Sequence, residues 1–458
     1  MQQDMTRGPI VPHIIKFTIP LFTGNLFQQF YNMADTVIVG RFVGADALAA
    51  VGSTGTIMFL LMGFAMGITS GFSILTSQKF GAGDEEGVKQ SIATGTIMTI
   101  IIAAALSISS SLGVNSLLTM MNTPENIIGD ARSYLTIICA GLSACIMYNL
   151  LSAYLRAVGN SQAPLFFLVF SAILNIGLDI LLIVHFKMGT AGAALATVLS
   201  QGISAVLCLF YIIARVKLLV PRADQWRIDS KTAGNQLRMG LPMALQFGVT
   251  ASGTMIMQTA INIFGSTAIA AFTAASKVSM LLTEGMFSLG QTMATYCGQN
   301  YGKGDISRLK EGTKRAIQIG AVYSIISGIL LMTLLPFFLS VFFSGDTSIA
   351  ELLPWARTYA ILSAVFYIPL CMIFIYRSAM EGCGYALLVL ICGIVEFITR
   401  FGCAILSMNV HSYFLAVFCD PAAWLTAGVF SFFAFLYVMK DVEKKLSPSS
   451  ELKQQSYR

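Results

Sequence analysis

The chain has 458 residues, of which 56% are hydrophobic and only 11% are charged, and its mean hydropathy is +0.75. Soluble domains carry about 25% charged residues, so this composition excludes an ordinary soluble protein and indicates a membrane protein. The formal net charge of +6 could suggest a nucleic-acid partner, but the positions of the basic residues along the chain argue against one.

Long apolar runs follow one another along the chain, and about 20 apolar residues are enough to cross a bilayer as a helix. Twelve such runs lie at residues 14–36, 46–76, 90–113, 132–155, 164–186, 190–214, 238–262, 268–297, 315–339, 354–377, 385–408 and 420–440. The preceding MQQDMTRGP lacks the pattern of a signal peptide, so we expect it to be retained. The predicted fold class is an all-α polytopic membrane protein with twelve transmembrane helices.

The basic residues indicate how the helices are oriented. Most of the 28 Lys and Arg lie at the two ends and in alternate connections, above all in residues 215–238. The positive-inside rule assigns these segments, and therefore both termini, to the cytoplasmic side. We expect a multi-pass protein of the inner (cytoplasmic) membrane that acts as a monomer, with the lipid bilayer and no nucleic acid as partner.

Cysteine and histidine give no sign of a cofactor or a metal. The nine cysteines lie in or beside apolar runs without a CxxC pair, as small hydrophobic side chains often do. The three histidines lie singly at the ends of apolar runs. We expect no cofactor, no metal site and no disulfide framework.

Two short segments return at one offset, which indicates an internal duplication. VGADALAA at 43–50 matches FGSTAIAA at 264–271, and SQKFGAGD at 77–84 matches GQNYGKGD at 298–305, both 221 residues later. Six helices in each copy predict a parallel repeat whose halves enclose a site near the middle of the bilayer, as in transporters. The predicted lobes are residues 1–215 and 238–440, joined by a cytoplasmic linker at 216–237 and followed by a cytoplasmic tail at 441–458.

Ionisable residues inside the apolar runs are expensive, at about 2.5–3.5 kcal/mol each near a helix centre. We place Asp35, Asp179, Glu284, Glu396 and Arg400 inside the membrane. A lone residue of this kind is as often a structural ion pair or a helix–helix contact as a functional group. Clustering with other polar residues favours function.

Polar residues of the first lobe cluster in this way. The helical spacing i, i+3, i+4 and i+7 places four of them on one face of the first helix, namely Gln28, Tyr31, Asn32 and Asp35. Asn175 and Asp179 share a face of the fifth helix, and Thr197 lies on the sixth, whose Gly and Ala allow close approach. Carboxylate, amide and hydroxyl oxygens suit a hard monovalent cation, and two desolvated carboxylates close together favour binding of a proton. The sequence therefore predicts a cation site.

The motifs IPLFTGNLFQQFYNMADTVIVGRFVGADALAAVG, GQNYGKGD, LRAVGNSQAP and LNIGLDILLI followed by GTAGAALATVLSQG resemble those of the multidrug and toxic compound extrusion (MATE) family, including its bacterial NorM-like and DinF-like members. The resemblance covers nearly the whole chain. It implies an antiporter for multidrug efflux, which exports small organic, often cationic and aromatic, compounds in exchange for H⁺ or Na⁺. It implies a cation-coupling role for Asp35, Asn175, Asp179 and Thr197, and a helix-bending role for Pro20.

The second lobe departs from the first. At the offset of 221, Glu396 and Arg400 fall opposite Asn175 and Asp179. Their i, i+4 spacing allows a salt bridge along one helix, so we expect a structural charge pair there and ion coupling in the first lobe.

An alternating-access transporter also needs a substrate cavity. We expect it to be lined by Gln28, Tyr31, Asn32, Met257, Gln258, Asn262 and Glu284. A flippase for lipids or lipid-linked oligosaccharides is the alternative, but only one clear mid-membrane cation, Arg400, is available for a pyrophosphate group. An enzyme is not expected, because the chain lacks the HExxH and GxxxxGK[ST] motifs and a Ser/His/Asp constellation.

Overall fold

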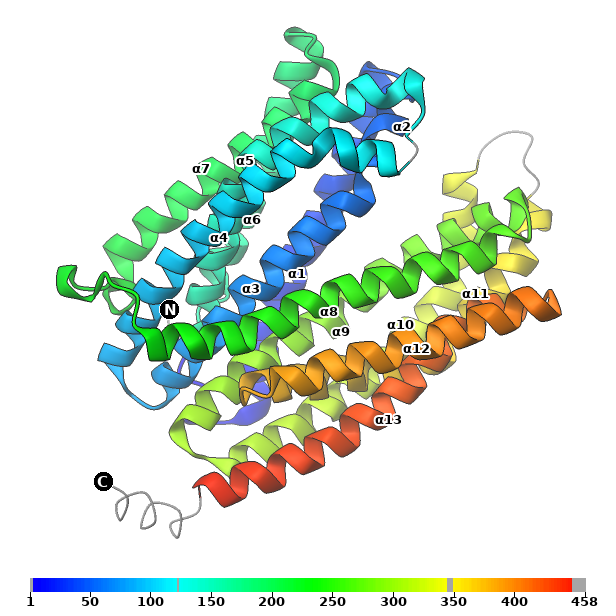
Figure 1. Ribbon diagram of the computed structural model, residues 1–458. Helices are drawn as coiled ribbons and strands as arrows, with labels where there is room; N and C mark the ends of the chain where they lie inside the picture. The colour runs from blue at the N-terminus through cyan, green and yellow to red at the C-terminus, as the bar shows by residue number, and fades with distance from the viewer. Residues whose placement is uncertain (1–2, 122, 344–348, 447–458) are drawn as a thin grey trace. The chain divides into compact units, whose positions relative to one another are not determined.

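The computed structural model describes residues 3–121, 123–343 and 349–446, and every regular element in these ranges is a helix (Figure 1). Eleven of the described helices are long and apolar enough to cross a membrane. The all-α membrane fold predicted from the sequence is therefore confirmed. The last part of the predicted tail, residues 447–458, lies outside the described residues.

The first half of the chain forms seven α-helices. These are α1 (Ile10–Phe42), α2 (Ala45–Ser53), α3 (Gly55–Gly81), α4 (Glu85–Met120), α5 (Glu125–Ala157), α6 (Gln162–Asp179) and α7 (Gly189–Arg215). Helix α6 continues as a π-helical stretch, Ile180–His185, and two 3₁₀ turns, Lys217–Leu219 and Ala223–Gln225, lie in the linker.

The second half forms six long helices. These are α8 (Ser230–Asn262), α9 (Ser266–Lys303), α10 (Ile306–Phe342), α11 (Ile349–Gly382), α12 (Ala386–Val410) and α13 (Tyr413–Leu446). The twelve apolar runs are helical over nearly their whole length, and most of the helices extend beyond them.

Two runs differ from the expectation of one uniform apolar helix. The second is divided between α2 and α3 at Thr54, within the sequence GSTG, whose residues are poor helix formers. The seventh corresponds to α8, which is long enough to span but is not among the eleven sufficiently apolar helices. Helix α8 carries polar residues such as Gln246, Thr250 and Gln258 along its length.

Large apolar side chains are exposed along the helices. Leu112 is 81% exposed, and Phe166 and Val365 are each 66% exposed. Exposed apolar surface on this scale is unfavourable in water, whereas lipid chains are as apolar as leucine. These helix faces therefore fit a bilayer environment.

The described chain separates into two compact units. One contains the described residues of Met1–Asp4 with Ile19–Ala244, and the other contains Met5–Thr18 with the described residues from Leu245 onward. The division thus falls inside α1 and α8 rather than in the predicted linker. Close packing explains why the start of α8 belongs to the first unit: a Cβ atom on Gly71 of α3 would lie 2.3 Å from the Cα of Gly240.

The duplication seen in the sequence recurs in the local structure. Gly83 and Gly304, 221 residues apart, have φ of 72° and 77°, which glycine adopts without strain. The next residues, Asp84 and Asp305, each accept a backbone N–H and cap α4 and α10. The two glycine-rich turns are therefore equivalent helix connections, and their glycines serve the backbone conformation.

Candidate cation site

Asp179 and Asn175 are held at the end of α6, where their side chains are almost completely buried, at 0% and 1% exposure. Asp179 is the last residue of the α-helical part, and the π-helical stretch begins at the next residue. Such stretches are frequent at functional sites. The i, i+4 spacing places the amide one turn from the carboxylate.

The amide of Asn175 connects this turn to α7. In the orientation that satisfies both ends of the amide, Asn175 donates to Oδ2 of Asp179 at 3.1 Å and accepts the backbone N–H of Thr197 at 3.2 Å. The amide also lies 3.4 Å from the Thr197 hydroxyl oxygen. Small residues make this approach possible, because Ala193, Ala194 and Ala196 of α7 are completely buried.

Asp35 completes the group from α1. Its side chain is partly buried and interacts directly with that of Asp179. The Oδ1 atoms of both aspartates are buried and lack hydrogen-bond partners. In the described part of the chain, no lysine or arginine forms an ion pair with either carboxylate. The structure thus brings together all four residues that were predicted to couple a cation.

Two tyrosines flank the carboxylates. Tyr31 of α1 and Tyr134 of α5 both lie within electrostatic range of Asp35 and Asp179. The sequence analysis placed Tyr31 among cavity residues and missed Tyr134. Asp130 lies one turn before Tyr134 on α5, but it is outside the apolar run and accepts a hydrogen bond from Thr190 of α7, so the sequence did not connect Tyr134 with the two carboxylates.

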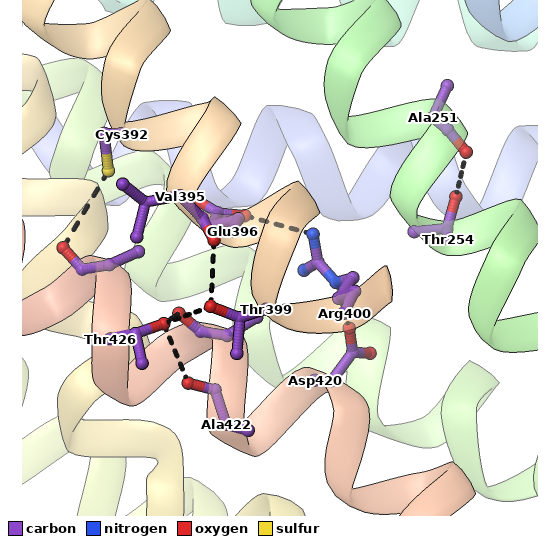
Figure 2. Close-up of polar contacts among 12 residues, drawn as sticks. Ala251, Thr254, Cys392, Val395, Glu396, Thr399, Arg400, Asp420, Ala422 and Thr426 are labelled. Carbon is purple, nitrogen blue, oxygen red and sulfur yellow. Dashed lines mark hydrogen bonds and ion pairs between the residues drawn. The ribbon is translucent and has the colours of Figure 1, made fainter. Parts of the chain in front are cut away.

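A second buried group of charges lies in the other unit, on α11, α12 and α13. Figure 2 shows Arg400 between Glu396 of its own helix and Asp420 of α13. Arg400 Nε donates to Asp420 Oδ1 at 2.7 Å, and Arg400 Nη1 donates to Glu396 Oε2 at 3.2 Å. Arg377 of α11 lies 3.7 Å from the other oxygen of Glu396. The salt bridge predicted within α12 is present, but it is part of a four-residue network.

The sequence analysis did not identify Asp420 and Arg377, because each lies at the edge of an apolar run. Helix α13 begins at Tyr413, so Asp420 lies seven residues inside it, about 10 Å along the axis. Helix α11 likewise continues five residues beyond Arg377. Residues that appeared to lie at the membrane surface are therefore within helices.

The predicted equivalence of the two lobes needs a correction. The turn after α5 places Gly159 at φ 80°, and the matching turn after α11 places Gly384 at φ 87°, at an offset of 225. The same offset relates the backbone bonds from Asn160 to Leu155 and from Tyr385 to Met380.

The offset grows because α10, the connection after it and α11 are together longer than their counterparts. The counterpart of Asn175 is therefore Arg400, and the counterpart of Asp179 is Ala404. The equivalence of Glu396 with Asn175 was wrong.

The residues predicted to line a substrate cavity belong to different units. Gln28, Tyr31 and Asn32 lie in the first unit, and Met257, Gln258, Asn262 and Glu284 lie in the second. Gln28 and Asn32 are exposed. In α8, Met257 is buried and Gln258 donates to Asn262 at 2.9 Å. Their role in substrate binding stays a prediction.

Pro20 lies within α1. The part of this helix up to Thr18 belongs to the second unit and the part from Ile19 belongs to the first, so Pro20 lies two residues after Thr18. On the second-unit side, the Thr18 hydroxyl lies 2.8 Å from that of Thr292. Proline removes one helical hydrogen bond and clashes with the preceding turn. The weakest point of α1 thus coincides with the boundary between its two parts.

No group of three or more His, Cys, Asp or Glu that could hold a metal occurs among the residues that the structure describes. The donor set of the candidate site is instead one of carboxylate, amide and hydroxyl oxygens. Such oxygens suit a proton or a hard monovalent cation rather than a transition metal.

Comparison with known proteins gives a consistent result. The family described as MatE matches residues 20–181 and 242–406. The probable multidrug resistance protein YpnP of Bacillus subtilis is 28% identical over 396 residues, which cover 86% of this chain and 87% of that protein. The FAD transporter of Shewanella oneidensis is 23% identical over 458 residues, covering 93% and 99%.

Solved structures share the fold. An outward-facing multidrug resistance MATE family transporter has a TM-score of 0.89 at 21% identity, covering 96% of this chain and 98% of that one. A MOP superfamily transporter from Pyrococcus furiosus has a TM-score of 0.90 at the same identity and coverage. The family match extends over both halves of the sequence, so the chain belongs to the MATE (MatE) family of multi-pass membrane transporters and is not an enzyme.

Proposed function

We propose that this transporter is a secondary antiporter that exports small organic compounds, often cationic and aromatic, in exchange for H⁺ or Na⁺. The observation that carries the proposal is the pair of buried carboxylates, Asp35 and Asp179, with no basic side chain paired to either among the described residues. Two uncompensated negative charges away from water are unfavourable, so the pair gains stability by binding a proton or a monovalent cation.

The neighbouring groups support the same role. The amide of Asn175 and the hydroxyl of Thr197 supply neutral oxygens, and the phenol groups of Tyr31 and Tyr134 flank the carboxylates. Protonation or cation binding would weaken the repulsion between the two carboxylates and change how α1 and α6 approach. Coupling requires that the ion and the substrate each prefer a different state of the transporter.

Alternating access supplies those two states in this proposal. Substrate enters from the cytoplasmic side or the inner leaflet, the ion binds from the outside, and α1 bends near Pro20 as substrate is released. The protein acts as a monomer in the inner membrane in this proposal, and the distribution of Lys and Arg supports a cytoplasmic position for both termini. The names of relatives such as YpnP support export of varied compounds.

The alternative of a flippase for lipid-linked pyrophosphates is less favoured. Such cargo needs unpaired basic groups, whereas Arg400 is paired with Glu396 and Asp420, and Arg377 lies beside Glu396. In the described interior of the second unit these arginines are engaged with carboxylates rather than available for phosphate.

The proposal is tested with purified protein in liposomes that contain a fluorescent organic cation. Efflux is measured under an imposed pH gradient and, separately, under an imposed Na⁺ gradient. Asp46→Asn is the matched control, since Asp46 is an exposed carboxylate on α2 of the same unit. One gradient should drive efflux in the wild type and the control but not in Asp35→Asn. Equal efflux by Asp35→Asn would contradict the proposal, and efflux that responds to neither gradient would rule out H⁺ or Na⁺ antiport.

A further inference from the structure

The second unit contains a counterpart of the cation site that is built differently. Arg400 occupies the position that corresponds to Asn175, at the offset of 225 set by the turns at Gly159 and Gly384. Asn175 contacts the carboxylate of Asp179 in the first unit. Arg400 contacts the carboxylates of Glu396 and Asp420 in the second. The position that holds a neutral amide in one half thus holds a permanent cation in the other.

The surroundings of Arg400 have the features of a cation-binding site. Its guanidinium lies between two carboxylates, and the exposed fractions are only 4% for Arg400 and 5% for Glu396. Figure 2 shows these carboxylates on either side of the guanidinium, one from α12 and one from α13. Planar guanidinium groups match carboxylates well and keep their charge at any physiological pH.

Helix α8 provides the space for this side chain. A Cβ atom on Gly253 would lie 3.2 Å from Cδ of Arg400 and 3.4 Å from its Nη1, so even one methyl group at this position crowds the guanidinium. At the offset of 221 that holds for this part of the repeat, Gly253 corresponds to Asn32 on the polar face of α1. The slot between α8, α12 and α13 is therefore shaped around the arginine.

The two sites differ in charge balance. Two arginines, Arg377 and Arg400, form ion pairs with two carboxylates, Glu396 and Asp420, in the second unit, and a third carboxylate, Glu381 of α11, lies within electrostatic range of Arg377. Without Arg400 the ion-paired groups that remain, Arg377, Glu396 and Asp420, would carry one net negative charge. That deficit matches one monovalent cation.

We propose that Arg400 is a tethered cation that permanently occupies the second-unit counterpart of the cation site and closes it to exchangeable ions. The site itself is a binding site for one guanidinium-like monovalent cation, which the chain supplies from its own sequence. The inference rests on the proposed function only for its consequence, namely that exchangeable ions bind in the first unit alone. The geometry of the site is independent of transport.

The test is chemical rescue. Arg400→Ala shortens the side chain and leaves a slot lined by Glu396, Asp420 and Gly253. We expect guanidinium chloride at low millimolar concentration to raise the unfolding midpoint of the purified variant by about 2–4 °C over equal NaCl, because it binds the folded state. The wild type and Arg400→Ala/Asp420→Ala should show no such rise. Equal effects of the two salts on Arg400→Ala would overturn the proposal.

A second pair of variants tests the slot if Arg400→Ala does not fold. Arg400→Ala/Asp420→Ala removes one charge of each sign and should fold. Gly253→Ala should lower the unfolding midpoint of the wild type, because the added methyl group crowds Arg400. The same substitution should have no effect in the double variant. An equal loss in both backgrounds would show that Arg400 does not fill the slot.

Measurements of stability and of transport distinguish this inference from the proposed function. In Arg400→Ala, rescue of stability by guanidinium supports the tethered cation whether or not the protein exports dye. Loss of gradient-driven efflux in Asp35→Asn concerns the first unit only. Each of the two hypotheses can therefore be contradicted while the other holds.

Discussion

The two halves of this transporter each bury a polar group around one pair of corresponding positions, Asn175 and Arg400, but with different charge balance. In the first unit, Asp35 and Asp179 lie together without a paired cation among the described residues. In the second, Arg400 joins Glu396 and Asp420 in salt bridges. The duplicated fold therefore brings one corresponding position into each polar group, whereas individual substitutions decide whether an exchangeable ion is needed there.

The largest effect is expected at Asp179, the most deeply buried carboxylate of the first unit. Asp179→Asn keeps the shape of the side chain but cannot bind a proton or carry a charge. We expect gradient-driven dye efflux to fall by about 100-fold or more with normal expression, since removal of an essential charged or proton-transferring group has effects of this order. Vesicle efflux at matched protein levels measures it, and wild-type efflux would assign Asp179 a packing role.

The next effect concerns the charge network of the second unit. Glu396→Gln leaves the buried Arg400 with one carboxylate fewer, and breaking such a pair costs about 3–5 kcal/mol. Adding Arg400→Gln removes the excess positive charge and should recover most of the folded protein. Thermal unfolding of the single and double variants measures this recovery. A double variant less stable than either single variant would contradict the network.

The neutral ligands should have smaller effects. Asn175→Ala and Thr197→Ala each remove one oxygen from the first-unit site and leave both carboxylates in place. We expect the half-saturating concentration of the coupling ion to rise about tenfold, which corresponds to about 1.4 kcal/mol of binding free energy, with little change in maximal rate. A titration of efflux rate against ion concentration gives both quantities. Unchanged half-saturation would remove these residues from the site.

Pro20 tests whether bending of α1 limits turnover. Pro20→Ala restores a helical hydrogen bond and should make the bend rarer. We expect turnover to be several-fold slower, with ion affinity and expression retained. Initial rates of efflux at saturating ion concentration measure this. Normal turnover would show that the proline only adjusts packing.

Substitution of the helix-capping aspartates should have the smallest effect, and the loss of stability should be the same in both halves. Asp84→Ala and Asp305→Ala each remove the acceptor of one N-terminal N–H, a loss of about 1 kcal/mol. Hydrogen bonds from Lys79 and from the N–H of Gly87 hold the pKa of Asp84 below its ordinary value. Its contribution is therefore complete above a pH of about 4 and is lost as the pH falls through the lowered pKa. Thermal unfolding at several pH values measures it, and unequal losses in the two halves at neutral pH would contradict equivalent caps.

Local patterns in the sequence predicted most of the fold and the centre of the candidate site. Apolar runs located the helices, and i, i+4 spacing placed Asn175 and Asp179 on one face of α6. Contacts between distant helices were less accessible. Tyr134 has only isoleucines one turn later on α5, and Asp420 lies at the edge of an apolar run.

The internal repeat was misaligned for a related reason. The offset of 221 is correct up to the turns at Gly83 and Gly304, where glycine and aspartate mark equivalent positions. Beyond them, the second copy is longer, and the backbone conformation and hydrogen bonds of the turns at Gly159 and Gly384 reveal the new offset. The four added residues are spread over α10, the connection after it and α11, and an apolar helix with one more residue has no distinct composition, so the added length is not visible in the sequence.

The most direct test of the account compares two paired substitutions in the same liposome assay. Asp35→Asn/Asp179→Asn removes the charges of the first-unit site, and Glu396→Gln/Arg400→Gln removes one charge of each sign from the second-unit network. The measurement is the initial rate of dye efflux with and without the gradient that drives the wild type. We predict that the first variant no longer responds to the gradient and that the second responds as the wild type does. A gradient response that survives in the first variant and disappears in the second, with both proteins folded, would contradict the account.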